Sequence, residues 1–179
     1  MMNPLQIIAK YYPADDALRR MLLQHSRAVA DKALAIAAAH PELHLDTAFL
    51  EEAALLHDIG IFLTDAPGIH CHGTQPYLCH GWLGAELLRS EGLPRHARVC
   101  ERHTGTGLTV TQIVQSGCPL PHHDMQPVTL EEQVVCFADK FYSKTRLDGE
   151  YTVAQARSKL EKFGQDGLDK FDRWCEELL

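Results

Sequence analysis

Apolar side chains recur at helical spacing along the first part of the chain. The pattern runs from Asp15 to about Ala39, and Pro41 ends it. Its apolar positions are Leu18, Met21, Leu22, Val29, Ala33 and Ile36. The spacing predicts a long amphipathic helix and places His25 on its buried stripe.

A second helical pattern begins near Asp46, a suitable N-cap, and ends in the sequence AALLHDIGIF at residues 53–62. Its inward positions are Phe49, Leu50, Ala53, Ala54 and His57. Adjacent residues on a helix do not share a face, so His57 and Asp58 can approach one point only where the helix ends beside a cavity. Ile59 and Gly60 supply that ending.

The rest of the chain alternates helical patterns with irregular segments. We expect helices at about 79–91, at 94–103, from a capping box at 129–132 to Lys144, and twice after Thr152. Segments 64–79 and 117–128 lack clear periodicity, so their role stays open. No alternating run of β-branched residues occurs, which predicts an all-α helical bundle.

Composition bounds the class of protein. The 179 residues suit one domain, with a metal-site core at about 15–146 and C-terminal helices at about 150–179. A net charge of −7 argues against nucleic acid as a partner. No apolar run is long enough for a membrane span, and no basic leader precedes one, so we expect a cytoplasmic protein. The six cysteines show no CxxC pair, which favours reduced thiols.

The candidate chemistry lies in imidazoles and carboxylates on five of the predicted helices or at their ends. These residues are His25, His57, Asp58, His80, His103 and Asp139. A buried charged group must be paired, neutralised or bound to a metal, and Asp139 has no evident basic partner on its own helix face. Imidazole and carboxylate together suit iron, manganese, zinc, cobalt or nickel better than magnesium or calcium. Two ions sharing Asp58 as a bridge would use all six ligands.

The sequence LLHDIG, with an upstream histidine and a downstream ADK aspartate, resembles the HD-domain superfamily of metal-dependent phosphohydrolases. The resemblance spans roughly His25 to Asp139, and it implies His25, His57, Asp58 and Asp139 as ligands of a first metal. His80 in CHGWLGAELL and His103 in ERHTGTG resemble second-metal ligands of the dinuclear branch, which includes bacterial diadenosine tetraphosphate hydrolases. Iron and manganese are the ions we favour.

Two departures from the family pattern bear on the substrate. Many members carry a lysine directly after HDIG, whereas this chain has Ile61, so Arg102 becomes our candidate for the basic role. The GYP signature of cyclic-di-GMP phosphodiesterases is missing, because residues 102–109 read RHTGTGLT at the place where that motif would lie. Its absence argues against cyclic-di-GMP as the substrate.

The resemblance implies hydrolysis of a phosphate ester or anhydride of a small molecule, a nucleotide among the candidates, by attack of a metal-bridging water. Asp58 and Arg102 are then the candidate catalytic residues, and Arg102 would also hold phosphoryl oxygens. Backbone amides at Gly105 and Gly107 could approach the phosphate. Lys140 and Lys144 flank Asp139; the pattern favours water for this pair, and Lys140 is kept as a candidate substrate ligand.

Alternatives remain open. Some HD-domain relatives use a similar six-ligand di-iron site to activate oxygen, with a phosphonate-like substrate as one case. The chain could also be a non-catalytic module that senses a metal or nucleotide. Segment 70–80, HCHGTQPYLCH, reads better as a lid over the metal pocket than as a small zinc-binding loop. The oligomeric state is not predicted.

Overall fold

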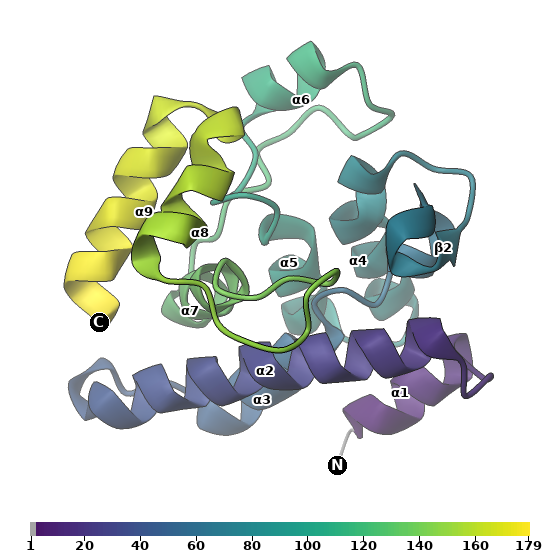
Figure 1. The fold of residues 1–179 in the computed structure, drawn as a ribbon, viewed down its shortest axis with the longest axis horizontal. Coiled ribbons are helices and arrows are strands. Elements are labelled where there is room, and N and C mark those ends of the chain that lie inside the picture. The colour runs from purple at the N-terminus through teal and green to yellow at the C-terminus, as the bar shows by residue number, and fades with distance from the viewer. Residues whose placement is uncertain (1–2) are drawn as a thin grey trace.

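The computed structural model describes residues 3–179 and confirms the all-α prediction (Figure 1). Its helices are α1 (Pro4–Tyr11), α2 (Ala17–Ala39), α3 (Thr47–Leu56), α4 (His80–Ser90), α5 (Pro94–Arg102), α6 (Val110–Ser116), α7 (Leu130–Asp139), α8 (Val153–Leu160) and α9 (Gln165–Leu178). Two short antiparallel strands, β1 (Asp65–Ala66) and β2 (Cys71–His72), lie in the segment before α4. Within the described range, no helix is both long and apolar enough to cross a bilayer.

Local capping explains most helix starts. Asp16 accepts a hydrogen bond from the backbone of Arg19 at the start of α2, and Asp46 does the same for Phe49 in α3. The sequence patterns did not identify α1 or α6. Yet α6 begins with a complete capping box between Thr109 and Gln112, a signal that was present in the sequence.

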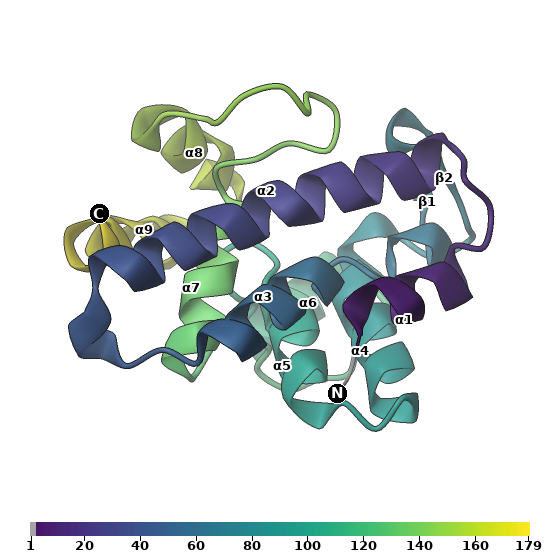
Figure 2. The same cartoon turned by 90° about the horizontal axis from the view of Figure 1, so that it is seen from below.

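The predicted extent of α7 is wrong. Thr129 caps the helix as expected, but the helix ends at Asp139, and residues 140–152 form a loop instead of carrying the helix on to Lys144. This loop is fastened to α2 because Lys32 Nζ lies 2.5 Å from a carboxylate oxygen of Glu150. It runs beside the middle of α2 in Figure 2. Because α7 ends at Asp139, the chain after it turns back towards the end of α7.

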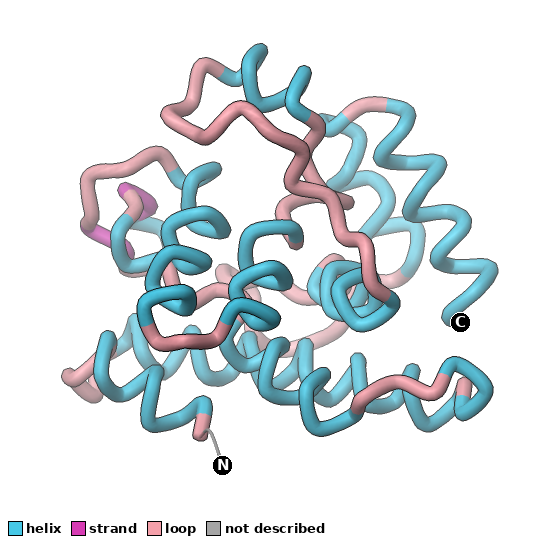
Figure 3. The backbone as a smooth tube through the Cα atoms, turned by 180° about the vertical axis from the view of Figure 1, so that it is seen from behind, coloured by secondary structure: helices cyan, strands magenta, loops and turns pink. Residues whose placement is uncertain are grey.

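The helices enclose two main apolar clusters. α2 packs along α3 and is crossed by α7 at a steep angle, and α4 packs along α5 (Figures 1 and 2). Val29 of α2 belongs to the cluster built with α7, α8 and α9, whereas Leu22 belongs to the cluster built with α1, α4 and α5. His25 lies between them on the same helix, at the junction of the two clusters. The long segments that flank α6 carry the chain from α5 to α7 (Figure 3).

Candidate metal centre

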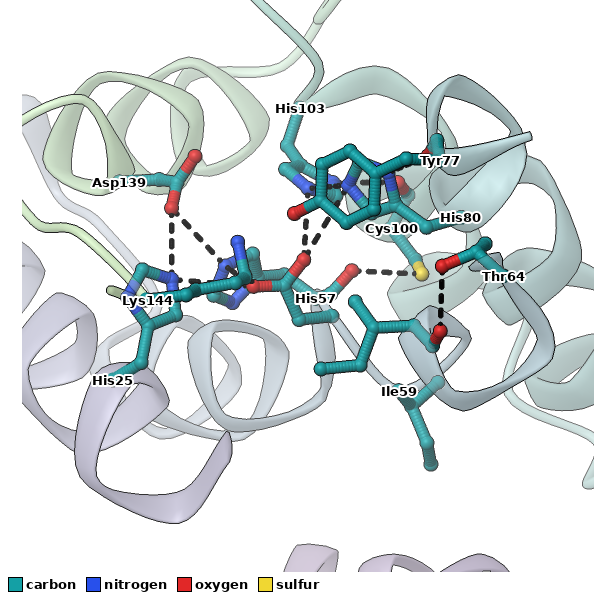
Figure 4. Close-up of polar contacts among 12 residues, drawn as sticks. His25, His57, Ile59, Thr64, Tyr77, His80, Cys100, His103, Asp139 and Lys144 are labelled. Carbon is teal, nitrogen blue, oxygen red and sulfur yellow. Dashed lines mark hydrogen bonds and ion pairs between the residues drawn. The ribbon is translucent and has the colours of Figure 1, made fainter. Parts of the chain in front are cut away.

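The six predicted ligands come together at the ends or middle of five helices. His25 lies within α2, His80 begins α4 and Asp139 ends α7, while His57 and His103 directly follow α3 and α5. They form two groups whose ligand atoms lie within 4.8 Å of one another. The first group is His25, His57, Asp58 and Asp139, and the second is Asp58, His80 and His103. Figure 4 shows the histidines and Asp139 directed towards a common centre.

The turn after α3 is held by contacts from distant parts of the chain. The Tyr12 hydroxyl donates to the carbonyl of Ile59 at 2.8 Å, and the Cys100 thiol donates to the carbonyl of His57 at 2.9 Å. A Cβ atom on Gly60 would lie 2.4 Å from the carbonyl oxygen of His80. Gly60 is therefore required because it lets the first turn of α4 approach closely, which brings His80 beside Asp58.

Three imidazoles are oriented by backbone carbonyls. Nδ1 of His57, His80 and His103 lies 2.6, 2.6 and 2.7 Å, respectively, from a carbonyl oxygen three residues earlier. A carbonyl only accepts, so each Nδ1 carries a proton, and each ring, when it is neutral, has its lone pair on Nε2. Nε2 of His80 and of His103 are only 3.0 Å apart. Two facing lone pairs repel, which is the arrangement that a cation between ligating imidazoles resolves.

Asp58 links the two groups through its two oxygens. Oδ2 lies 3.2 Å from His25 Nε2 and 3.1 Å from His57 Nε2. Oδ1 lies 3.4 Å from His80 Nε2 and 3.3 Å from His103 Nε2. Both oxygens are buried, and among residues 3–179 neither makes a hydrogen bond of good geometry. Lys144 Nζ, 2.6 Å from Oδ2, is the ammonium group paired with this carboxylate, and Oδ1 faces only imidazole nitrogens. A buried carboxylate so placed fits coordination to cations, because a buried charge that is not fully compensated is costly.

The electrostatics favour charged carboxylates beside neutral imidazoles in the second group. Burial opposes ionisation of Asp58, but His57 and Lys144 hold its pKa well below the usual range. Burial and the neighbouring His103 lower the pKa of His80 to about 3, which leaves the His80 ring neutral and able to bind a metal. Burial also opposes protonation of His57, yet the charge of Asp58 raises the pKa of His57 to about 9.

Two lysines turn into the centre, contrary to the expectation that they face water. Lys144 Nζ lies 2.6 Å from Asp58 Oδ2, and the Lys144 side chain is only 12% exposed. Lys140 Nζ lies 2.8 Å from Asp139 Oδ2 and donates to the carbonyl of His103. Lys144 reaches this position because α7 ends at Asp139 and the following loop folds back.

The structure does not bring Arg102 to the centre. Its guanidinium donates to the Glu132 carboxylate at 2.8 Å, and that carboxylate is 3% exposed. Arg102 is also absent from the described lining of the cavity beside the centre. It balances a buried charge on α7 instead of facing a substrate.

The two glycines serve packing. Gly105 lines the cavity, but the place of its missing Cβ is taken by the ring of Phe163, with carbon atoms 3.0 to 3.2 Å away. Gly107 is pressed against the backbone of Gln126 in the same way. Both have positive φ, which favours glycine.

A cavity of about 180 Å³ opens beside the centre and is lined by Tyr77, His80, His103, Asp139 and Lys140, among others. The Tyr77 ring stacks on His80, with ring centroids 4.5 Å apart. Segment 64–79 therefore contributes a wall of the cavity. Across the described residues, the groups close enough to hold a metal include none of His70, Cys71, His72 and Cys79, the donors of the alternative zinc-binding loop.

Comparison with known proteins identifies the class. The model of the HD domain family matches residues 22–143, a range that includes all six candidate ligands. The chain therefore belongs to the HD domain family, as its resemblance predicted.

The chain is similar to several individual proteins. An uncharacterised protein of Methanocaldococcus jannaschii is 35% identical over 70% of this chain and 68% of its own length. A tRNA (cytidine(56)-2'-O)-methyltransferase of Thermoplasma volcanium is 33% identical over 98% of this chain, which spans only 46% of that relative. The crystallised HD domain of the L. monocytogenes phosphodiesterase PgpH has the same fold, with 20% identity, 99% of this chain and 87% of that chain covered, and a TM-score of 0.55.

Proposed function

We propose that this protein is a metal-dependent phosphohydrolase that cleaves a phosphate ester or anhydride of a small molecule. One observation carries the proposal: three imidazoles have Nδ1 engaged by backbone carbonyls and Nε2 directed at a buried cluster whose shared carboxylate is Asp58. Asp58 offers one oxygen to each donor group, so the arrangement supports two ions instead of one. The mixed nitrogen and oxygen donors favour iron or manganese, with zinc, cobalt or nickel as alternatives.

Divalent ions bound here would lower the pKa of a coordinated water and draw negative charge from the phosphoryl oxygens. The chain itself supplies the remaining functions. Lys140 and Lys144 place ammonium groups at the cavity, where they can neutralise charge that develops on the phosphoryl group during attack. These two lysines replace Arg102 in the basic role. Gly105 and Tyr77 also line the cavity.

The comparisons guide the choice of substrate. A second structure of the PgpH HD domain, in complex with cyclic-di-AMP, is 21% identical to this chain over 98% of its length. That ligand belongs to PgpH, and it supports testing nucleotide phosphodiesters here. The name of the Thermoplasma relative raises tRNA as another partner. Because the net charge of −7 disfavours a phosphate backbone, we propose a small molecule and no nucleic acid.

The test is a screen of phosphorylated metabolites with protein purified anaerobically and loaded with manganese or iron. Asp58→Ala should lower both the bound metal and kcat, by about a thousandfold or more for kcat, because it removes a ligand common to both groups. Asp148→Ala is the matched control, since Asp148 is exposed in the 140–152 loop. Unchanged metal content and activity in Asp58→Ala would refute the proposal.

Two further outcomes identify the alternative functions. Consumption of oxygen with substrate, and loss of turnover under nitrogen, would show an oxygenase. Tight nucleotide binding without product, over all the metals tested, would show a sensing module. Turnover by the manganese-loaded protein without oxygen supports hydrolysis.

A further inference from the structure

The cavity beside the metal centre has a wall that lies outside the range matched by the HD domain family. Residues 22–143 carry the six candidate ligands. The cavity is also lined by Lys159 and Leu160 from the end of α8, and by Lys162 and Phe163 from the turn that follows. This chain therefore adds its own C-terminal side chains to the site.

The two lysines of this wall have no acidic partner in the described part of the chain. Eleven of the 17 lysine and arginine side chains lie within 4.0 Å of a carboxylate, including Lys140 and Lys144. Lys159 and Lys162 instead lie over aromatic rings, with Nζ 4.6 Å and 5.2 Å from the ring centroids. In a chain with a net charge of −7, positive charge without a partner beside the centre marks a place for an anion.

The residues that line the cavity carry a net positive charge. Four lysines and a single carboxylate, Asp139, contribute to it among the described residues. Lys140 already contacts that carboxylate, and Lys144 contacts Asp58 beneath it. The excess positive charge therefore resides at Lys159 and Lys162, farther out along the wall.

The space also continues past the centre. A neighbouring cavity of about 440 Å³ shares Tyr77, Tyr142, Lys144 and Lys162 with the first. Lys162 therefore borders both cavities. A substrate that reaches the metal centre with one end can extend past Lys162 with the other.

We propose that Lys159 and Lys162 bind a second phosphoryl group of the substrate, so that the protein prefers bisphosphorylated small molecules to monophosphates. This inference rests on the proposed phosphohydrolase function. The phosphoryl group that is cleaved is held by the metal centre with Lys140 and Lys144. The other phosphoryl group of the substrate lies against the wall formed by Lys159 and Lys162. An ammonium–phosphate contact is a charge-assisted hydrogen bond, which is stronger than a neutral one.

The test compares two non-hydrolysable probes on manganese-loaded protein by calorimetry: propane-1,3-bisphosphonate, which carries two anionic groups, and propylphosphonate, which carries one. In the double variant Lys159→Ala/Lys162→Ala, the Kd for the bisphosphonate should rise by about 10- to 100-fold, because each lost charged contact is worth roughly tenfold. Propylphosphonate has no second anionic group to contact these lysines, so its Kd should change less than about threefold. The control Arg19→Ala/Arg173→Ala removes the same charge from residues outside the cavity lining.

Kinetics give the second readout. With matched bisphosphate and monophosphate substrates, the double variant should raise KM for the bisphosphate and leave kcat unchanged. Equal weakening of both probes, or no change in either, would overturn the inference while leaving hydrolysis intact. Lysine-dependent binding of the bisphosphonate without turnover of any substrate would instead refute the phosphohydrolase proposal and leave the second anion site standing.

Discussion

Replacing Lys144 with methionine tests whether this lysine occupies the place of a cation when no metal is bound. Lys144 Nζ lies 2.6 Å from Asp58 Oδ2, and the Lys144 and Asp58 side chains are 12% and 0% exposed. The ion pair is thus largely removed from water. Methionine keeps much of the apolar stem and removes the charge, so the change isolates the electrostatic contribution.

The expected loss follows from this geometry. At 2.6 Å and an effective dielectric constant near 20, the Coulomb attraction is about 6 kcal/mol, and removing one partner of a buried pair typically costs about 3–5 kcal/mol. For a chain of this size, that corresponds to a Tm about 6–20 °C lower in the metal-free protein. Bound ions supply the missing charge, so the loss should fall by at least half when metal saturates the centre.

The loss of stability is linked thermodynamically to the affinity for the metal. If Lys144→Met destabilises the metal-free protein more than the loaded protein, the variant must bind manganese more tightly, by about tenfold for each 1.4 kcal/mol of difference. Activity should nevertheless fall, because the ammonium group is then missing from the cavity. Improved metal binding together with poorer catalysis separates this role from simple structural damage.

The assay is thermal unfolding with and without manganese, followed by titration of the ion. Lys10→Met is the control, because Lys10 Nζ also lies 2.6 Å from a carboxylate, that of Glu91, but its side chain is 62% exposed. A surface pair of this kind contributes little, so the control should behave like the natural protein. An equal loss of stability with and without metal would refute our interpretation of Lys144.

Three further predictions address the centre and its surroundings. Asp58→Ala should remove both ions and His80→Ala only one, as measured by elemental analysis; an unchanged ratio of metal to protein in either variant would contradict the shared-ligand arrangement. Gly60→Ala should lower stability by about 1–3 kcal/mol in thermal unfolding, because its Cβ would meet backbone atoms at 2.4 Å, whereas Gly68→Ala, with open space around it, should be neutral. Burial raises the pKa of the four buried thiols, to about 11 for those at 71, 79 and 136, so iodoacetamide near pH 8 should modify the half-buried Cys118 and Cys175 before any of them, as measured by mass spectrometry; early labelling of a buried thiol would contradict this.

The sequence predicted those parts of the fold that depend on local signals. The apolar spacing of α2 and the cap at Asp46 are set within a few residues, and both are found in the structure. The clustering of the six ligands was predictable because imidazoles on apolar stripes have few other ways to be satisfied, and the HDIG pattern fixed their order. The fold class follows from the same periodicity.

The parts that were not predictable depend on contacts between distant segments. The end of α7 could not be located from its apolar run, because the loop after it is held by Lys32 with Glu150 and by the amide of Tyr151, which donates to the carbonyl of Phe141. The C-terminal wall of the cavity is likewise a tertiary feature. Lys159 shows no spacing relative to the HDIG motif that would place it beside His80.

The position of Arg102 away from the centre has a geometric cause. Arg102 precedes the ligand His103 and is still within α5, so its side chain is rotated about 100° away from that of a helical neighbour and meets Glu132. Lys140 follows the last helical residue, Asp139, and its backbone keeps helical dihedral angles, but its long side chain carries Nζ to 2.8 Å from Asp139 Oδ2. Thr104, which follows His103 beyond the end of α5, also lines the cavity. At both helix ends, the residue after the ligand lines the cavity, whereas Arg102, the residue before His103, does not.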